Sequence, residues 1–92
     1  MEQCTDAELV GKALAGDREA FGLLVARYQD HAYGMAVSVL ADFDLAGDVV
    51  QEGFLHAYRG LHKLKEPQRF AGWLRGIVRH MAFRALRELN SV

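Results

Sequence analysis

Apolar residues recur at helical spacing along most of the chain, and this periodicity restricts the fold more than any other feature. In residues 44–61 the apolar stripe consists of Val50, Phe54, Ala57, Tyr58 and Leu61, at positions i, i+4, i+7, i+8 and i+11. Stripes of the same spacing occur in residues 21–39 and 70–85. No stretch alternates between apolar and polar residues for long enough to predict a strand. The sequence therefore predicts an all-α fold, a small bundle of about four helices.

Capping signals set the expected limits of the first two helices. Thr5 and Glu8 have the spacing of a capping box and predict the start of a short helix that ends near residues 15–16. Asp17 is placed to cap the second helix.

Breaks in the apolar periodicity set the expected limits of the third and fourth helices. Residues 41–44 interrupt the second stripe, and Asp44 is the expected cap of the third helix. Residues 62–68 include Pro67, the only proline, and predict a loop. A fourth helix is expected from about residue 69 to residue 88.

Length and composition are typical of one small globular domain. The chain has 92 residues and no repeat, low-complexity tract or linker, so the whole of 1–92 is predicted to be a single domain. Cys4 is the only cysteine, which excludes an internal disulfide. The N-terminus is polar and acidic, unlike a signal peptide, and no apolar run is long enough to cross a bilayer. These features predict a cytoplasmic protein.

Charge is divided unevenly along the chain, although the net charge is only −1. Residues 1–58 contain ten acidic and three basic residues, whereas residues 59–87 contain eight basic residues and Glu66 as the only acid. Such asymmetry predicts a basic partner at one end and a polyanion at the other.

A second stripe on the third predicted helix carries Asp48, Gln51, Glu52, Leu55 and Arg59, with two acids and an amide at its start. Solvated helix faces usually mix both charge signs, whereas this one combines acids and an amide with an apolar side chain. The pattern favours docking onto a basic helix.

The fourth predicted helix and the loop before it combine many basic residues with the only tryptophan. At about 100° per residue, one side of the helix carries Arg69, Trp73, His80, Arg84 and Arg87, while Arg75 and Arg79 project from another. Lys63 and Lys65 lie in the loop. Guanidinium groups neutralise phosphates and an indole stacks on bases, so the set predicts nucleic-acid binding. The alternatives are a solvated basic face, a core role for Trp73, and loop lysines that only add solubility.

Catalytic and metal-binding patterns are missing from the sequence. The four histidines and Cys4 have none of the spacings of metal sites. Glu52 and His56 are one turn apart, but no nucleophile or Gly-rich phosphate loop accompanies them. The sequence therefore predicts a protein without metal, cofactor or enzymatic activity.

Three motifs, in order, resemble region 2 of bacterial sigma factors, particularly the extracytoplasmic-function group. The first is G-D-R-E-A-F from Gly16 to Phe21, followed by Leu24 and Tyr28. The second is D-V-V-Q-E-G-F-L-H-A-Y over residues 48–58, and the third is F-A-G-W-L-R-G-I over residues 70–77. His80 and Arg84 depart from the family, which commonly has Asn at the first position and often Asp or Asn at the second.

The resemblance implies a sigma-factor domain that binds core RNA polymerase and the promoter −10 element. Asp48, Gln51, Glu52 and Leu55 would contact the coiled coil of the polymerase clamp. The residues implied to bind the single-stranded non-template strand are Lys63, Lys65, Arg69, Trp73, Arg75, Arg79, His80, Arg84 and Arg87. The His80 departure puts the base preference in doubt. An anti-sigma factor is a further expected partner.

Two other interpretations remain open on the sequence. A sigma mimic would bind an anti-sigma factor without meeting promoter DNA, and a generic helical domain would explain the composition but not the three motifs. The chain has no segment resembling the region 4 helix-turn-helix of complete sigma factors, so we expect either a fragment or an atypical short member of the family.

Overall fold

The computed structural model describes residues 4–91 and confirms the all-α prediction. Within these residues there are four α-helices: α1 (Asp6–Leu14), α2 (Arg18–Leu40), α3 (Phe43–Gly60) and α4 (Phe70–Asn90). The predicted loop between α3 and α4 contains two short 3₁₀ helices, η1 (Leu61–Lys63) and η2 (Pro67–Arg69). No helix in the described part of the chain is both long enough and apolar enough to span a bilayer.

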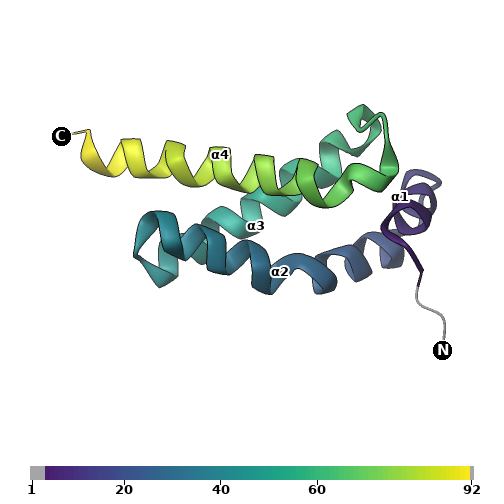
Figure 1. The fold of residues 1–92 in the computed structure, drawn as a ribbon, viewed down its shortest axis with the longest axis horizontal. Helices are drawn as coiled ribbons and strands as arrows, with labels where there is room; N and C mark the ends of the chain where they lie inside the picture. Colours follow the sequence, from purple (N-terminus) through teal and green to yellow (C-terminus); the bar gives the residue numbers. More distant parts are fainter. Residues whose placement is uncertain (1–3, 92) are drawn as a thin grey trace.

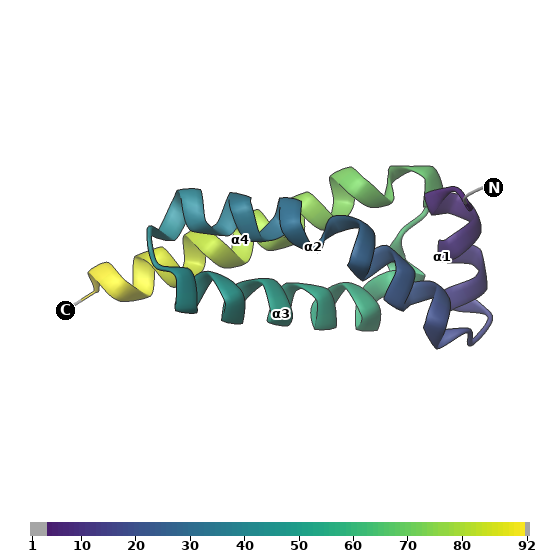
Figure 2. The same ribbon diagram turned by 90° about the horizontal axis from the view of Figure 1, so that it is seen from below.

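Three long helices form the body of the molecule (Figure 1). α2 and α3 run antiparallel and are joined by a tight turn, and α4 then runs back in the direction of α2. α1 lies across the end of the bundle at which α2 and α4 begin, as the second view also shows (Figure 2). The loop that connects α3 to α4 therefore lies at the same end as α1.

The first two capping predictions are confirmed, and the third is wrong. The Thr5 hydroxyl accepts a hydrogen bond from the Glu8 amide (3.1 Å), the Glu8 carboxylate accepts one from the Thr5 amide (3.0 Å), and Asp17 caps α2. α3, however, is capped by Asp42, whose carboxylate accepts from the Leu45 amide (3.0 Å). The reason is that Ala41 takes a left-handed conformation (φ 53°), which ends α2 and reverses the chain within two residues. Asp44 instead lies in the first turn of α3.

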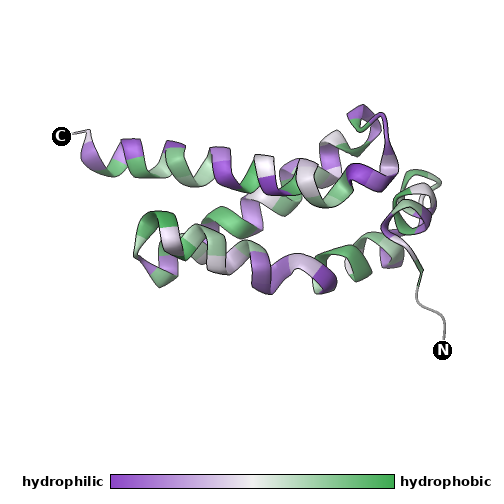
Figure 3. Ribbon diagram, in the orientation of Figure 1, coloured by the Kyte–Doolittle hydropathy of each residue, from purple (hydrophilic) through white to green (hydrophobic). Residues whose placement is uncertain are grey.

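The core lies along the axis shared by α2, α3 and α4, with their apolar sides turned inward (Figure 3). Phe70 is fully buried, and its ring lies 6.4 Å from that of Phe21 and 5.8 Å from that of Tyr28, measured between centroids. The prediction that Tyr58 faces the core is wrong, because 43% of this residue is exposed. Its ring makes a T-shaped contact with that of Phe21, with 4.9 Å between the centroids.

α3 and α4 approach each other closely at Gly53, a buried position of the second motif. A Cβ atom added there would lie only 3.0 Å from Cγ2 of Val78. A larger residue would force Val78 to shift. The glycine therefore permits the close approach of the two helices that carry most of the predicted site residues.

α1 is fastened to α2 by a polar cluster that the sequence did not predict. Asp6 accepts hydrogen bonds from the Arg27 guanidinium (2.7 Å) and from the Tyr28 hydroxyl, and Arg27 also donates to the Cys4 carbonyl (2.8 Å). Burial, followed by the hydrogen bond to Asp6 and the negative charge of that residue, raises the pKa of Tyr28. The Tyr28 ring of this cluster also lies against that of Phe70, at the end where α4 begins.

Candidate functional site

The polar stripe predicted on α3 is exposed along its whole length. Asp48, Gln51, Glu52 and Leu55 project from the side of α3 opposite its buried residues, and we call these four residues the α3 ridge. Leu55 is 48% exposed. Among residues 4–91 neither Asp48 nor Glu52 forms an ion pair. The ridge therefore presents unneutralised carboxylates around an exposed leucine.

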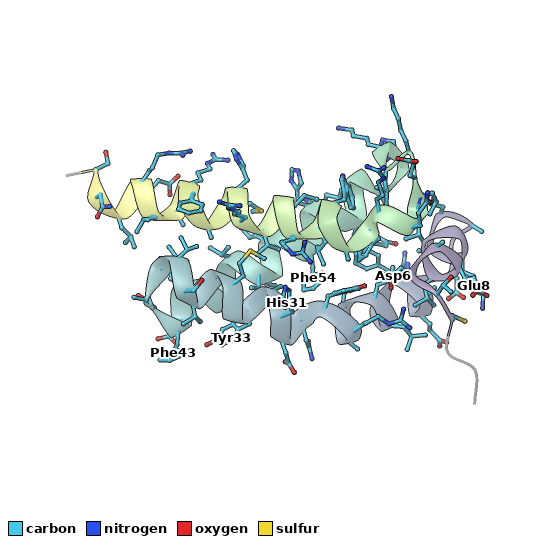
Figure 4. All side chains as sticks on the ribbon, viewed as in Figure 1. Asp6, Glu8, His31, Tyr33, Phe43 and Phe54 are labelled. Carbon is cyan, nitrogen blue, oxygen red and sulfur yellow. The ribbon has the colours of Figure 1, made fainter. Side chains whose placement is uncertain are left out.

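An apolar groove runs along one flank of the ridge, between α2 and α3, with a volume of about 540 Å³. Its lining includes Phe21, Val25 and Tyr33 from α2 and Val50, Phe54 and Tyr58 from α3. Gln51 and Leu55 belong to both the ridge and this α2/α3 groove. Tyr33 and Phe43 stack at the turn that joins the two helices, with centroids 6.5 Å apart (Figure 4). Apolar helix grooves of this kind receive apolar side chains of partner helices.

The loop between α3 and α4 forms a pocket of about 550 Å³, which we call the loop pocket. It is lined by Leu64, Lys65, Glu66, Arg69, Gly72 and Trp73. Arg69 pairs with Glu66 (Nε to Oε2, 2.9 Å), but both side chains are more than half exposed, so the pair contributes little stability. Trp73 is half-buried: its ring lies 6.0 Å from that of Phe70, and Cζ2 lies near Gly60.

The loop pocket has the groups needed to hold a nucleotide. An indole at its wall offers a surface on which a base can stack, and Lys65 and Arg69 are placed to neutralise phosphates. Lys63 is exposed just before the pocket. The sequence identified these cations and the tryptophan, but missed Leu64, Glu66 and Gly72, which complete the lining.

The structure distributes the basic residues of α4 over several places. Arg75 lies between α2 and α4, beside Tyr28 and His31. The Arg79 guanidinium stands 5.7 Å from the centroid of the Phe83 ring. The exposed residues His80 and Arg87 share the side of α4 that carries Trp73, because α4 is continuous from Phe70 to Asn90.

Arg84 lines a third depression, between α3 and α4, together with Asp48 and Glu52. The sequence assigned Arg84 to one surface and the two acids to another, whereas the fold brings the three residues to one groove. Over residues 4–91 no three His, Cys, Asp or Glu side chains are grouped so that they could hold a metal ion.

Comparisons with known proteins agree with this geometry. The family model described as Sigma-70 region 2 matches residues 24–92. The sigma-E factor of Haemophilus influenzae is 41% identical over 73 residues, that of Escherichia coli K12 is 44% identical over 73 residues, and the sigma-H factor of Pseudomonas aeruginosa is 39% identical over 74 residues. These alignments cover 79–80% of this chain but 38% of each relative.

A solved structure is similar over almost the entire chain. It is the complex of an engineered region 2 of sigmaE with GTAAAA, and it superposes with a TM-score of 0.88 at 37% sequence identity, covering 98% of this chain and 94% of the other. The resemblance found from the three motifs is therefore confirmed, as is the predicted fold.

Proposed function

Because the chain belongs to the sigma-70 region 2 family, we propose that it binds core RNA polymerase and recognises and melts the promoter −10 element during transcription initiation. The observation that carries the proposal is the similarity to a sigmaE region 2 that was solved with GTAAAA, at a TM-score of 0.88. Action on promoter DNA would place the protein in the cytoplasm.

The loop pocket supplies the proposed DNA contacts. A base extruded from the duplex would stack on Trp73, while Lys63, Lys65 and Arg69 neutralise the flanking phosphates. Melting would follow because the pocket binds an unstacked base and has no equivalent contact with a paired one, so binding shifts the equilibrium toward open DNA. The domain would perform no covalent chemistry, since the polymerase supplies catalysis.

The α3 ridge supplies the proposed polymerase contacts. Its carboxylates would pair with basic side chains of the coiled coil of the clamp, and Leu55 would pack against that helix at the rim of the α2/α3 groove. An anti-sigma factor is proposed as a second protein partner. By covering the ridge and the adjoining groove it would prevent polymerase from binding.

Binding of labelled single-stranded GTAAAA, followed by fluorescence anisotropy, tests the DNA part of the proposal. We expect the affinity to fall as salt is added, because each neutralised phosphate releases counterions. Lys65→Glu should weaken binding at least about fivefold and make the salt dependence shallower. Lys12→Glu, the same charge change on α1 at an exposed position outside the pocket, is the matched control and should have an effect below about twofold.

Trp73 gives an independent signal, because it is the only tryptophan and lies in the pocket wall. Its emission should change when GTAAAA is added and should change less with a duplex of the same sequence. A domain that binds an anti-sigma factor but shows no salt-sensitive DNA binding and no Trp73 response would instead be the sigma mimic.

A further inference from the structure

The α3/α4 groove has an apolar floor, which separates it from an ordinary solvated helix seam. Leu45 and Val49 of α3 and Met81 and Ala85 of α4 line it, and its volume is about 340 Å³. Val49 is buried and the other three are half-buried, so the floor can be reached from solvent. The space is sufficient for an aliphatic side chain of a partner.

The rim of this groove is mainly acidic. Asp48 and Glu52 stand on one side, and Glu88 and Arg84 on the other. Arg84 and Glu88 are 3.8 Å apart (Nε to Oε1), and their side chains are 67% and 74% exposed, so the pair opens at little energetic cost. Three carboxylates face one guanidinium, a balance that repels a DNA phosphate and attracts a cation.

The acids of α3 also repel one another within the helix. Asp44, Asp48 and Glu52 follow at i, i+4 and i+8, and like charges at this spacing destabilise a helix by a few tenths of a kcal/mol per pair. Within residues 4–91 none of the three forms an ion pair. A basic partner that docks in the groove would relieve this repulsion.

We propose that the polymerase-binding surface continues from the α3 ridge into the α3/α4 groove, where it receives a basic segment of polymerase anchored by an aliphatic side chain. The aliphatic group occupies the floor, and neighbouring Lys or Arg side chains pair with Asp48, Glu52 and Glu88. Continuity supports one partner for both surfaces, because Asp48 and Glu52 belong to the ridge and to the groove rim. The inference rests on the proposed polymerase-binding function.

The inference gives a role in protein binding to two residues of α4. The sequence assigned no role to Glu88 and assigned Arg84 to DNA. Glu88 becomes a contact for the protein partner. Arg84, at the same rim, limits the negative charge of the groove and lies where polymerase-bound and DNA-bound surfaces meet.

Capture of Escherichia coli core RNA polymerase by the immobilised 92-residue chain tests the inference at low and moderate salt. Glu88→Lys places a cation at the rim, and Ala85→Phe fills the floor without changing charge. Glu19→Lys, on the exposed first turn of α2, is the matched charge control. Leu55→Asp disrupts the ridge and the α2/α3 groove but lies outside the α3/α4 groove. Circular dichroism shows whether each variant keeps the helical fold.

We expect Glu88→Lys and Ala85→Phe each to weaken capture about tenfold, and Glu19→Lys to change it less than twofold, since like charges at a docked surface are strongly unfavourable. If folded Glu88→Lys and Ala85→Phe capture polymerase as the parent does while Leu55→Asp does not, the groove is not part of the interface and the proposed function stands. If the parent chain captures no polymerase, both the proposed polymerase binding and the inference are contradicted.

Discussion

α3 and α4 each bury an apolar side, but their exposed surfaces carry opposite charge. On α3 the acidic residues form one ridge, directly opposite the buried side, with grooves on both flanks. On α4 the basic residues are divided among the loop pocket, the side facing α2, and the groove shared with α3. A compact acidic surface suits one docking helix, whereas the basic residues outside the α3/α4 groove, spread along the helix, suit a flexible strand that follows the protein. The predictions below test whether these two surfaces are separate.

Truncation of the core should have the largest effect and should remove both surfaces together. Phe70 begins α4, is fully buried and packs against Phe21, Tyr28 and Trp73. Phe70→Ala should lower the free energy of unfolding by about 3–5 kcal/mol, a large part of the stability of so small a domain. Urea unfolding followed by circular dichroism measures the loss. A variant that unfolds at the parent's urea concentration would contradict the assigned core.

Charge reversal on the α3 ridge should affect one surface only. Asp48→Lys/Glu52→Lys places two cations against a basic partner helix, and we expect capture of core polymerase to fall by about 100-fold. Both side chains are exposed, so the unfolding midpoint should hardly change. Affinity for GTAAAA should be maintained or slightly raised, because the added charges are positive. Unchanged polymerase capture would remove the functional distinction between α3 and α4.

A third change tests the end of the molecule where α1 meets α4. Tyr28→Phe removes the hydrogen bond to Asp6, and we expect a loss of about 1–2 kcal/mol. The raised pKa of Tyr28 means that the folded chain holds the phenol proton more tightly than the unfolded chain. The stability that the protonated Tyr28 contributes is therefore fully present below the unfolded pKa, near 10.0, and is lost as pH rises through the higher folded pKa.

The parent should accordingly lose stability above pH 10 more steeply than Tyr28→Phe, as measured by thermal melting at a series of pH values. Tyr33→Phe is the matched control, because the Tyr33 hydroxyl donates to an exposed backbone carbonyl, that of Phe43 (3.1 Å). Equal alkaline destabilisation of the parent and Tyr28→Phe would show that the Asp6 hydrogen bond is not responsible.

The helices and most of the core could be predicted from the sequence because a 3.6-residue period determines which side of a helix is buried. The α3 ridge could be predicted for the same reason, since it lies opposite that side. Asp42 and Asp44 have the same capping chemistry two residues apart, however, and the choice depended on the left-handed turn at Ala41. Local pattern alone could not supply that backbone conformation.

Contacts between distant segments could not be predicted in this way. Asp6 meets Arg27 and Tyr28 across more than twenty residues of sequence. A helical projection places Arg84 on a side of α4 but does not say which helix that side faces. Only the packing of α3 against α4, which approach each other closely at Gly53, shows that Arg84 shares a groove with Asp48 and Glu52.

Substitution of His80 should give the smallest change in affinity. It tests whether side chains on the exposed side of α4 reach base edges or only phosphates. Its side chain is exposed on the side of α4 that carries Trp73, at the position where the resemblance to sigma region 2 implies Asn. A side chain that reaches a base edge alters preference, whereas one that reaches a phosphate alters affinity for all sequences alike. His80→Asn should therefore change the affinity for GTAAAA by less than about threefold but shift the preferred base at one position about fivefold, or about 1 kcal/mol, the lower end of the range of base discrimination. A panel of GTAAAA oligonucleotides with single substitutions measures this preference.

Arg87→Gln, on the same side of α4, is the control and should weaken the binding of every oligonucleotide to a similar extent. If His80→Asn also acted uniformly across the panel, base reading would have to reside in the loop pocket, and the exposed side of α4 would serve only to hold the backbone.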